Sequence, residues 1–563
     1  MRIHSLLFGL ALVATGCADA TETETVEKEA ADTEALDALF ADWDRDDAPG
    51  CAVAAKREGE ALFSRAWGMA DLEHDIANTP ETLFEAGSVS KQFVAATVLL
   101  LDQEGKLSLD EDVREHIPEL PDYNETITLR RLIHHTSGLR DWGQVAAISG
   151  WSRDQRTHDH DHVLDILSRQ QALNFAPGAH YSYSNSGYNL LAVIVERVTG
   201  EPFADYSQEL LFEPLGMDDT QWRDDYTRVV PGRSSAYSGE PGDDFFSINR
   251  PIEHVHGNGG LLTTVHDLLT WNQALTDGAL GEELSARMQE PDVLANGREI
   301  HYAAGLQLDE DHGQSSIGHT GATSGYRAYL MRFPEQAVSV AMLCNVSGVD
   351  TREQGSDLSR IALGDAAEEP EKPPEPADVG KDVLEARAGL YADVRNHRPL
   401  ELAVDGDKLI IPADPDNDDD EPEAVIPLSA DRFLVPERDK ELVFTSTDNE
   451  RPGIRVRRDG YDEERLIPVT PADPSPETLA DYTGDYASDE AETRLRIEVD
   501  DGQLYAKRRP ADRFELEAIY PEAFEADDLG LLRFTRDDDG KVDGLSFSRG
   551  RVYGIRFQRE DDG

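Results

Sequence analysis

The stretch SVSKQFVAATVLLL at residues 88–101 decides the fold of this chain. It is apolar nearly all round, so we expect a helix at the centre of a domain. The helix nevertheless begins with Ser88 and carries Lys91 in its first turn, and at this spacing the two side chains share a face. Burial and the positive end of the helix dipole favour a neutral amine, which can take a proton from a serine hydroxyl. The alternative is that Ser88 only caps the helix and Lys91 extends to solvent.

Two further short motifs carry groups suited to the same chemistry. In Tyr183-Ser184-Asn185, the phenol is a second acid or base, and the amide of Asn185 offers a donor and an acceptor to a substrate amide. By itself this triplet also fits an Asx-type turn. His319-Thr320-Gly321-Ala322 stands before an expected strand, where glycine lets a substrate backbone approach closely.

The regions around these motifs predict one antiparallel sheet built from both ends of a domain. Strand patterns cover residues 51–57 and 61–67, joined by a turn at 58–60, and return at 326–333 and 337–345 before a helix that ends near Leu363. The segment between them is mainly helical and includes helices over 163–169 and 189–198. We therefore expect an α+β (α/β) domain over residues 36–364, with the helical middle packed against the sheet.

The composition changes after this domain. Residues 365–382 are rich in proline and acidic residues, which is typical of a linker. The strand-rich remainder repeats at an offset of 95 residues, since GLYA at 389–392 returns as GDYA at 484–487. We expect two antiparallel β-barrel-like modules, at 383–470 and 476–563.

The motifs S-x-x-K, Y-x-N and H-x-G come in the order used by one known family. With LIHHTSGL at 132–139 and GGLLTT at 259–264, they cover the chain from about residue 36 to residue 364. The sequence resembles the serine β-lactamase and penicillin-binding-protein superfamily, in the branch that holds class C β-lactamases, D-aminopeptidases and some esterases.

This resemblance implies a serine hydrolase that needs no metal or cofactor. Ser88 would attack a carbonyl carbon to form an acyl-enzyme, and Lys91 and Tyr183 would move its proton. The oxyanion would lie between the backbone amides of Ser88 and Ala322. Asn185 would hold the amide of the acyl group, and His319, Thr320 and Gly321 would line the opposite wall. His135 is expected to be structural.

His319 stands where many β-lactamases and carboxypeptidases have lysine, and there is no lysine between Lys106 and Lys372. A histidine is only partly charged near neutral pH, so recognition of a substrate carboxylate is less favoured. Arg327 is an alternative cation, although a solvated surface arginine is the expected state. The resemblance thus favours D-amino-acid peptides, then small esters, over β-lactams.

Other functions stay open. A non-catalytic envelope lipoprotein that binds cell-wall peptide or senses a β-lactam is the main alternative, and a plain structural lipoprotein is a third. The C-terminal modules resemble the D-aminopeptidase arrangement, in which such modules act around the active-site entrance. Spacer barrels without a role in selectivity are an equal alternative.

The acidic surface limits the partners. The formal net charge is -60, from 113 acidic and 53 basic residues, which excludes nucleic acid and simple adsorption to anionic lipid. Such a surface is typical of proteins from salt-loving organisms. A small-molecule or peptide substrate is the expected partner, and the oligomeric state is left open.

The N-terminus predicts export. Residues 1–17 form a signal peptide that ends in Ala14-Thr15-Gly16-Cys17, which resembles a lipoprotein processing site. Lipid attachment at Cys17 would leave residues 18–35 as an acidic tether and make the anchor the only membrane contact; ordinary secretion is the alternative. No later segment is apolar enough to span a bilayer, and Cys51 and Cys344 are expected to be buried free thiols.

Two patterns suggest metal sites, and we predict that neither is one. The run HDHDH at 158–162 suits an acidic first turn of the helix that follows. The acidic run at 414–421 mimics a calcium loop but lacks its glycine and its final glutamate. A solvated loop between strands is expected there.

Overall fold

The computed structural model describes residues 33–369, 372–413, 421–447, 450–509, 511–526 and 529–560. The predicted signal peptide, Cys17 and most of the acidic tether lie outside these residues, as does nearly all of the acidic run at 414–421. Residues 33–39 are helical, so this helix includes the last three residues of the predicted tether.

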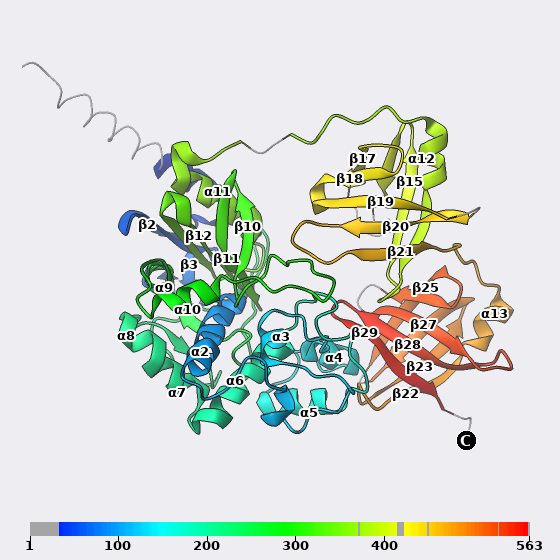
Figure 1. Ribbon diagram of the computed structural model, residues 1–563, viewed down its shortest axis with the longest axis horizontal. Coiled ribbons are helices and arrows are strands. Elements are labelled where there is room, and N and C mark those ends of the chain that lie inside the picture. Colours follow the sequence, from blue (N-terminus) through cyan, green and yellow to red (C-terminus); the bar gives the residue numbers. More distant parts are fainter. Residues whose placement is uncertain are drawn as a thin grey trace, which may run out of the picture.

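A six-stranded antiparallel sheet in the order β10-β11-β12-β13-β1-β2 forms the centre of the N-terminal domain (Figure 1). As expected, the sheet combines both ends of the domain. Its strands are β1 (Cys51–Arg57), β2 (Glu60–Trp67), β10 (Gln307–Asp311), β11 (Gln314–Thr323), β12 (Tyr326–Phe333) and β13 (Val338–Cys344).

Alternate residues of these strands belong to two separate cores, as the two-residue period of a strand requires. Ala52 and Ala54 pack with the helical region, whereas Val53 and Ala55 pack beneath α11 (Thr351–Leu363). Both faces of the sheet are therefore covered, and its interior strands are buried on both sides.

The helical region packs around α2, the helix that begins at Lys91. Nearly every residue of α2 is buried, as its composition predicts. The region contains α2 (Lys91–Gln103), α3 (Leu129–Ile133), α4 (Trp142–Ser149), α5 (His160–Ser168), α6 (Asn185–Thr199), α7 (Phe203–Ser207), the π-helical η4 (Gln208–Phe212), α8 (Glu213–Leu215), α9 (Val265–Asp277) and α10 (Glu282–Met288).

Short strands and 3-10 turns connect these helices. They are η1 (Ala41–Trp43), β3 (Met69–Asp71), β4 (Ile76–Ala77), β5 (Phe84–Glu85), η2 (Gly87–Ser90), η3 (Val113–Glu115), β6 (Gln221–Trp222), β7 (Tyr237–Ser238), β8 (Ser247–Ile248), β9 (Leu261–Thr263), η5 (Pro334–Gln336) and η6 (Gly364–Ala366). Strand β5 pairs with β9, and this pairing fixes the chain just before Ser88.

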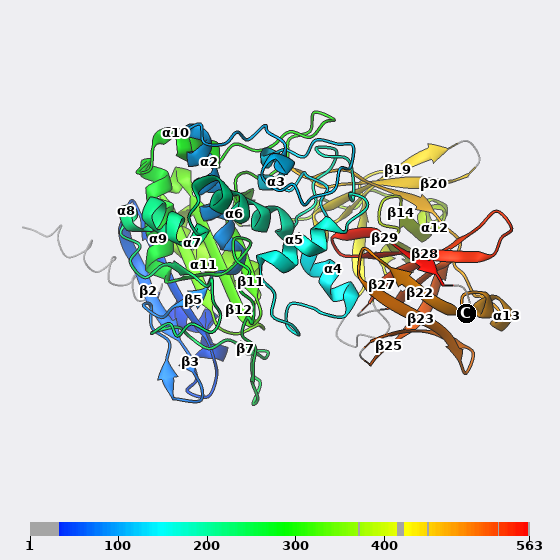
Figure 2. The ribbon, with the colours of Figure 1, turned by 90° about the horizontal axis from the view of Figure 1, so that it is seen from below.

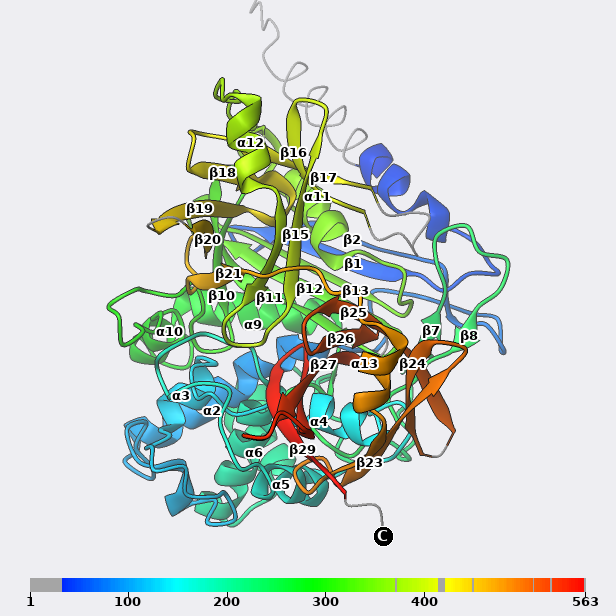
Figure 3. The same cartoon turned by 90° about the vertical axis from the view of Figure 1, so that its right-hand side faces the viewer.

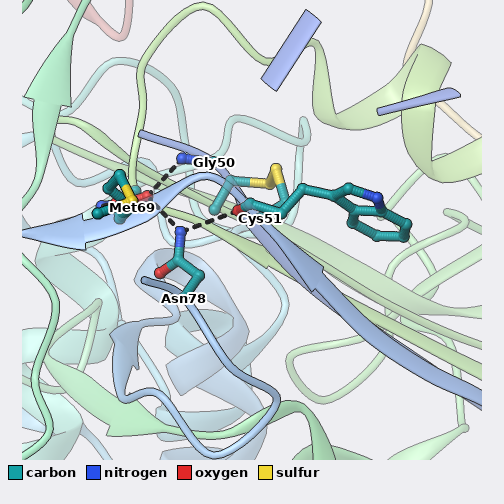
Figure 4. The surroundings of a disulfide bond; sticks show 7 residues. Gly50, Cys51, Met69 and Asn78 are labelled. Atoms are coloured by element: carbon teal, nitrogen blue, oxygen red, sulfur yellow. Dashed lines mark hydrogen bonds between the residues drawn. A yellow bond between two sulfur atoms is a disulfide. The ribbon is translucent and has the colours of Figure 1, made fainter. Parts of the chain in front are cut away.

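The expectation of two free thiols is wrong, because Cys51 and Cys344 form a disulfide (Figure 4). The two cysteines are direct partners in the β1–β13 register, so the sheet brings their side chains together. They are 293 residues apart in sequence, and this pairing follows from the closure of the sheet rather than from any local pattern. Disulfides of this kind are typical of oxidising compartments.

The C-terminal half consists of two closed eight-stranded antiparallel barrels, which confirms the two predicted modules (Figures 1 and 3). The first contains β14 (Gly389–Asp393), β15 (Pro399–Asp405), β16 (Lys408–Ile411), β17 (Glu423–Pro427), β18 (Arg432–Val435), η7 (Pro436–Arg438), β19 (Lys440–Thr447), β20 (Glu450–Arg457) and β21 (Glu464–Pro468). The second contains β22 (Gly484–Ser488), β23 (Thr493–Asp500), β24 (Gln503–Arg508), β25 (Asp512–Tyr520), β26 (Ala523–Ala526), β27 (Gly530–Arg536), β28 (Val542–Arg549) and β29 (Val552–Arg559).

Each barrel is preceded by a short helix that the strand patterns did not predict: α12 (Lys381–Arg387), which begins inside the predicted linker, and α13 (Pro476–Asp481). The repeated tyrosine joins each helix end to its barrel. The Tyr391 hydroxyl donates to the carbonyl of Arg387 at 2.8 Å, and that of Tyr486 donates to Tyr482 at 2.7 Å. The sequence repeat thus encodes a helix and barrel together.

The second barrel packs against the N-terminal domain beside α4 (Figures 1 and 2). Arg140 and Glu490 form an ion pair across this interface, and both side chains are only 2% exposed. Asn174 binds the turn between β28 and β29 where it enters β29, donating to the carbonyl of Arg551 at 2.8 Å and accepting from the Tyr553 amide at 2.9 Å. The N-terminal domain therefore holds this side of the turn in place.

None of the helices within the described ranges is both long and apolar enough to cross a membrane.

Candidate active site

Ser88 lies in η2, immediately before α2, in an otherwise closed environment. From Thr82 to Leu99 every residue is buried except Ser88, which is partly exposed. Burial of its neighbours fixes the backbone, while the hydroxyl remains accessible to a substrate. This is the arrangement that a nucleophile requires.

Lys91 is completely buried and lies one turn further along, and its amine has three partners. Its Nζ atom lies 3.0 Å from Ser88 Oγ, 3.0 Å from Asn185 Oδ1 and 2.6 Å from the carbonyl oxygen of Asn258. None of these partners is a carboxylate. A neutral amine has two N–H bonds for the two carbonyl oxygens and one lone pair, which then accepts the Ser88 proton.

Burial lowers the pKa of Lys91 well below its usual value, and the positive charges of Arg551 and Arg153 lower it further, against the opposite effect of Asp141. A buried ammonium loses its hydration, so the neutral form is favoured. The lowered pKa thus favours the form of the amine that can accept a proton.

Tyr183 also lies close to Lys91: the Nζ atom of Lys91 is 4.8 Å from the centre of the phenol ring. Burial raises the pKa of Tyr183, and the nearby Ser88 side chain lowers this pKa by a smaller amount. The phenol is therefore protonated at neutral pH. Its hydroxyl is buried and makes no hydrogen bond to any residue within the described ranges, so it has a proton available for another group.

Asn185 is the first residue of α6, so the motif spans a helix start rather than an isolated turn. Its backbone amide donates to Asp141 Oδ2 at 2.9 Å, and its side chain accepts from Lys91. His135, which adopts a positive φ of 58°, forms hydrogen bonds with the loop that precedes α6. The Ser184 amide donates to its Nδ1 at 3.2 Å, and the Ser182 amide donates to its carbonyl at 3.0 Å. Through these two hydrogen bonds His135 fixes the position of the loop, which is the structural role expected for it.

His319 is on β11 and is only 3% exposed. Burial and the charge of Lys91 lower the pKa of His319 to about 3, so the ring is neutral rather than partly charged. Its Nε2 atom lies 3.2 Å from the hydroxyl of Tyr302, a residue that the sequence analysis missed. His319 cannot supply the positive charge that a lysine has at this place in related enzymes.

Gly321 and Ala322 bring the backbone of β11 against η2. A Cβ atom at Gly321 would lie 2.1 Å from the carbonyl oxygen of Ala86 and 3.1 Å from the Ser88 amide nitrogen. A Cβ atom at Gly87 would lie 2.8 Å from the Ala322 amide nitrogen. Only glycine fits at these two positions, because the backbone of β11 near Ala322 lies directly against the backbone of η2 near Ser88. Thr320 is partly buried on the same strand.

A cavity of about 390 Å³ opens beside Ala322. Its walls include Arg153, Asp154, Glu253, Ser324 and Arg327. Arg327 is partly buried rather than solvated, and its Nη1 donates to the carbonyls of Ser324 and Tyr326 at 2.9 Å. The cavity adjoins the expected oxyanion site and has room for a substrate group.

The second barrel contributes a side chain to this site. Arg551, in the turn between β28 and β29, lies with its guanidinium carbon 5.2 Å from the centre of the Tyr183 ring. Its Nη1 atom is 3.5 Å from Asp141 Oδ2, and Asp141 is 2% exposed. The sequence analysis missed both residues, because neither belongs to a catalytic motif. The barrel therefore contacts two side chains of the N-terminal domain that lie near Lys91, those of Tyr183 and Asp141, which argues against a spacer role.

Among the described residues, one group of side chains is placed to hold a metal ion: His160, Glu196 and His256. Ser88 and Lys91 are not part of it.

The buried amine beside a partly exposed serine, on a helix behind an antiparallel sheet, defines a serine hydrolase of the penicillin-recognising class. A beta-lactamase family model matches residues 33–363, which is more than half of the chain. The chain thus belongs to the beta-lactamase family and is a serine hydrolase.

One of its relatives matches over more than nine-tenths of the chain, both barrels included. A D-aminopeptidase of Brucella melitensis is 27% identical over 534 residues, covering 91% of this chain and 96% of the relative. A D-aminopeptidase of Gluconobacter oxydans is 28% identical over 461 residues, covering 81% of this chain and 83% of the relative. The similarity therefore includes the C-terminal modules as well as the catalytic domain.

Solved structures support the fold. The octameric penicillin-binding protein homologue from Pyrococcus abyssi matches with a TM-score of 0.52 and 23% identity, covering 80% of this chain and 99% of that one. SurE matches with a TM-score of 0.53 and 21% identity, covering 78% of this chain and 100% of that one.

Proposed function

We propose that this protein hydrolyses amides or esters of D-amino acids through an acyl-enzyme on Ser88. The observation that carries the proposal is the amine of Lys91, buried, with two carbonyl acceptors and with Ser88 Oγ at 3.0 Å. A protein that only binds peptide has no use for such an amine. The D-amino-acid preference rests on the named activity of relatives that match over 91% and 81% of the chain.

The proposed reaction divides proton transfer between two side chains. Lys91 takes the hydroxyl proton as Ser88 Oγ attacks the carbonyl carbon, and the amides of Ser88 and Ala322 stabilise the oxyanion. Tyr183 keeps its proton at neutral pH and is the nearby acid for the leaving group. The ammonium of Lys91 then returns a proton to Tyr183. Water attacks the acyl carbon and gives a proton to Lys91, which passes it to Ser88 Oγ as the acid is released, so that all three side chains regain their starting states.

Asn185 has a supporting role in the proposal. Its Oδ1 orients Lys91, and its NH₂ group is the donor that remains for a substrate carbonyl. The neutral His319 and its partner Tyr302 form a wall without charge. A substrate whose carboxylate must be held at this wall is therefore disfavoured, which places β-lactams after D-peptides and small esters.

A substrate panel tests this proposal. We expect hydrolysis of D-alanine p-nitroanilide and of p-nitrophenyl acetate. The D-alanine anilide should be preferred over its L isomer by roughly tenfold or more in kcat/KM, which is about 1.4 kcal/mol in the transition state. Rates for all four compounds, with a cephalosporin as the fourth, are measured side by side. Faster turnover of the cephalosporin, or equal rates for the two isomers, would contradict the proposed substrate class.

The contribution of the barrel is tested through pH. We expect Arg551→Gln to raise the pKa of Lys91, because the guanidinium is the strongest neighbouring charge that lowers it. A group with a higher pKa stays protonated to higher pH, so the acid limb of the acylation profile should shift upward. The loss of rate should therefore be larger at pH 6 than at pH 9.

Arg556→Gln is the matched control, since Arg556 is an exposed arginine on β29 of the same barrel. Its profile should coincide with that of the unmodified enzyme. A uniform loss at all pH values in Arg551→Gln would show that the arginine acts only on binding or packing.

A further inference from the structure

Three side chains from distant parts of the sequence meet beside α6 and are not used in the proposed hydrolysis. His160 is the first residue of α5, Glu196 is near the end of α6, and His256 is in the segment between β8 and β9. One ligand atom from each of them lies within 4.8 Å of the other two. We propose that they form a binding site for a divalent transition-metal ion, with Zn²⁺ as the best match.

The state of His256 is the main evidence beyond proximity. The residue is 7% exposed, and its Nδ1 lies 3.0 Å from the carbonyl oxygen of His254, so Nδ1 carries the proton and donates it. The other nitrogen, Nε2, is buried and has no hydrogen-bond partner among the residues that the structure describes. A buried lone pair without a partner is costly. An imidazole that donates from one nitrogen to a backbone carbonyl and presents the other is the usual state of a metal ligand.

The other two residues complete a suitable donor set. Glu196 accepts the Phe203 amide proton with Oε1 at 3.1 Å, which leaves Oε2 for a ligand bond. His160 is held at the site by its Nε2, 3.0 Å from the carbonyl oxygen of His256, and the two rings lie 4.5 Å apart between centroids. Two imidazoles and one carboxylate suit Zn²⁺. Because His160 and Glu196 are partly exposed, water can enter as the fourth ligand.

The residues of the HDHDH run at 158–162 have different roles in the structure. Asp159 caps α5, as expected for a helix start, and His162 takes part in the same capping contact. His160 alone turns toward Glu196 and His256. The metal site is therefore not made by the run itself, which is why its spacing did not predict it.

The site is connected to the catalytic amine through the side chain of Asn189 and through Asn258. Asn189 Nδ2 donates to the carbonyl of His256 at 2.8 Å and to Oδ1 of Asn258 at 2.7 Å. The carbonyl of Asn258 is the acceptor 2.6 Å from Lys91 Nζ. A metal ion bound here would fix residues 256–258, the segment whose Asn258 carbonyl contacts Lys91. Its role is to stabilise that segment and not to take part in the reaction.

The test is a calorimetric titration of the full chain with ZnCl₂ after removal of metals with EDTA, without a histidine tag. We expect one Zn²⁺ per chain with a Kd in the micromolar range or tighter, and a rise in Tm when the site is filled. Glu196→Gln keeps an acceptor for the Phe203 amide but loses the charge, and His160→Asn removes one imidazole. Each should weaken binding by roughly tenfold or more.

His162→Asn is the control, because it removes a histidine from the same run without touching the three proposed ligands. Its Zn²⁺ affinity should stay within about twofold of that of the unmodified chain. Labelling of Ser88 by a fluorophosphonate checks that each variant is folded, independently of metal. Absence of stoichiometric binding would overturn the proposal. So would a Glu196→Gln affinity equal to that of the unmodified chain, or several weak sites on the acidic surface that none of the variants changes.

Discussion

Replacing Ser88 with alanine should abolish covalent labelling by a fluorophosphonate probe and lower kcat by roughly three orders of magnitude or more. The reason is that Ser88 is the one partly exposed residue in a buried stretch and is the hydroxyl beside the neutral amine. Without Oγ no acyl-enzyme forms, whatever the state of the remaining groups. Gel fluorescence of the probe adduct and mass spectrometry of the labelled peptide measure the effect.

Ser90→Ala is the matched control for this substitution. Ser90 is buried two residues further on, and its hydroxyl accepts from the Leu261 amide at 3.2 Å. This variant should keep its labelling, which separates loss of the nucleophile from disturbance of the helix start. Labelling that survives in Ser88→Ala would remove Ser88 from the mechanism.

Replacing Lys91 should lower the acylation rate by roughly a hundredfold or more, because removal of the proton from Ser88 is lost. Two variants distinguish basicity from charge. Lys91→Met removes the amine, and Lys91→Arg keeps a cation that cannot give up its proton. If the neutral amine is the base, both variants are slow. A Lys91→Arg variant near the normal rate would instead indicate that positive charge is what the site needs.

The pH dependence gives an independent measure of the same group. Because the pKa of Lys91 is lowered by burial and by Arg551 and Arg153, the amine loses its proton at a lower pH than an exposed lysine does. The acylation rate should therefore fall as the pH decreases through that lowered pKa, and it should level off below the pH at which an exposed lysine deprotonates. His319, whose pKa is about 3, should contribute no step between pH 5 and 8. A rate that rises tenfold per pH unit up to pH 10 would contradict this assignment.

The catalytic domain was largely predictable because its signals are local. The continuous apolar pattern of residues 88–101 could only be a buried helix, and the strand patterns at 51–57 and 326–333 are found in one sheet. The repeat at an offset of 95 residues predicted two barrels, because each copy carries its own strand patterns. The helices α12 and α13 were missed, since short amphipathic helices at domain starts resemble polar linkers in composition.

What the sequence missed depends on contacts between distant segments. Cys51 and Cys344 are brought together only when the first and last strands of the sheet pair. Asn258 acts through its carbonyl, which no side-chain motif reveals, although it directly precedes the GGLLTT block that was singled out. Arg551 belongs to another domain, and its approach to Tyr183 depends on how a barrel turn is held by Asn174.

Because Arg551 lies in the second barrel, the catalytic residues and one of the charges that act on the pKa of Lys91 are in different domains. The nucleophile and its base are encoded in the first domain, whereas Arg551, a cation that adds to the effect of burial in lowering the pKa of that base, is encoded in the second barrel. Substitutions at a hairpin tip can thus adapt the enzyme to a more acidic or more alkaline habitat while the catalytic segment stays identical. Homologues grouped by their first domain alone would then include enzymes with different working ranges.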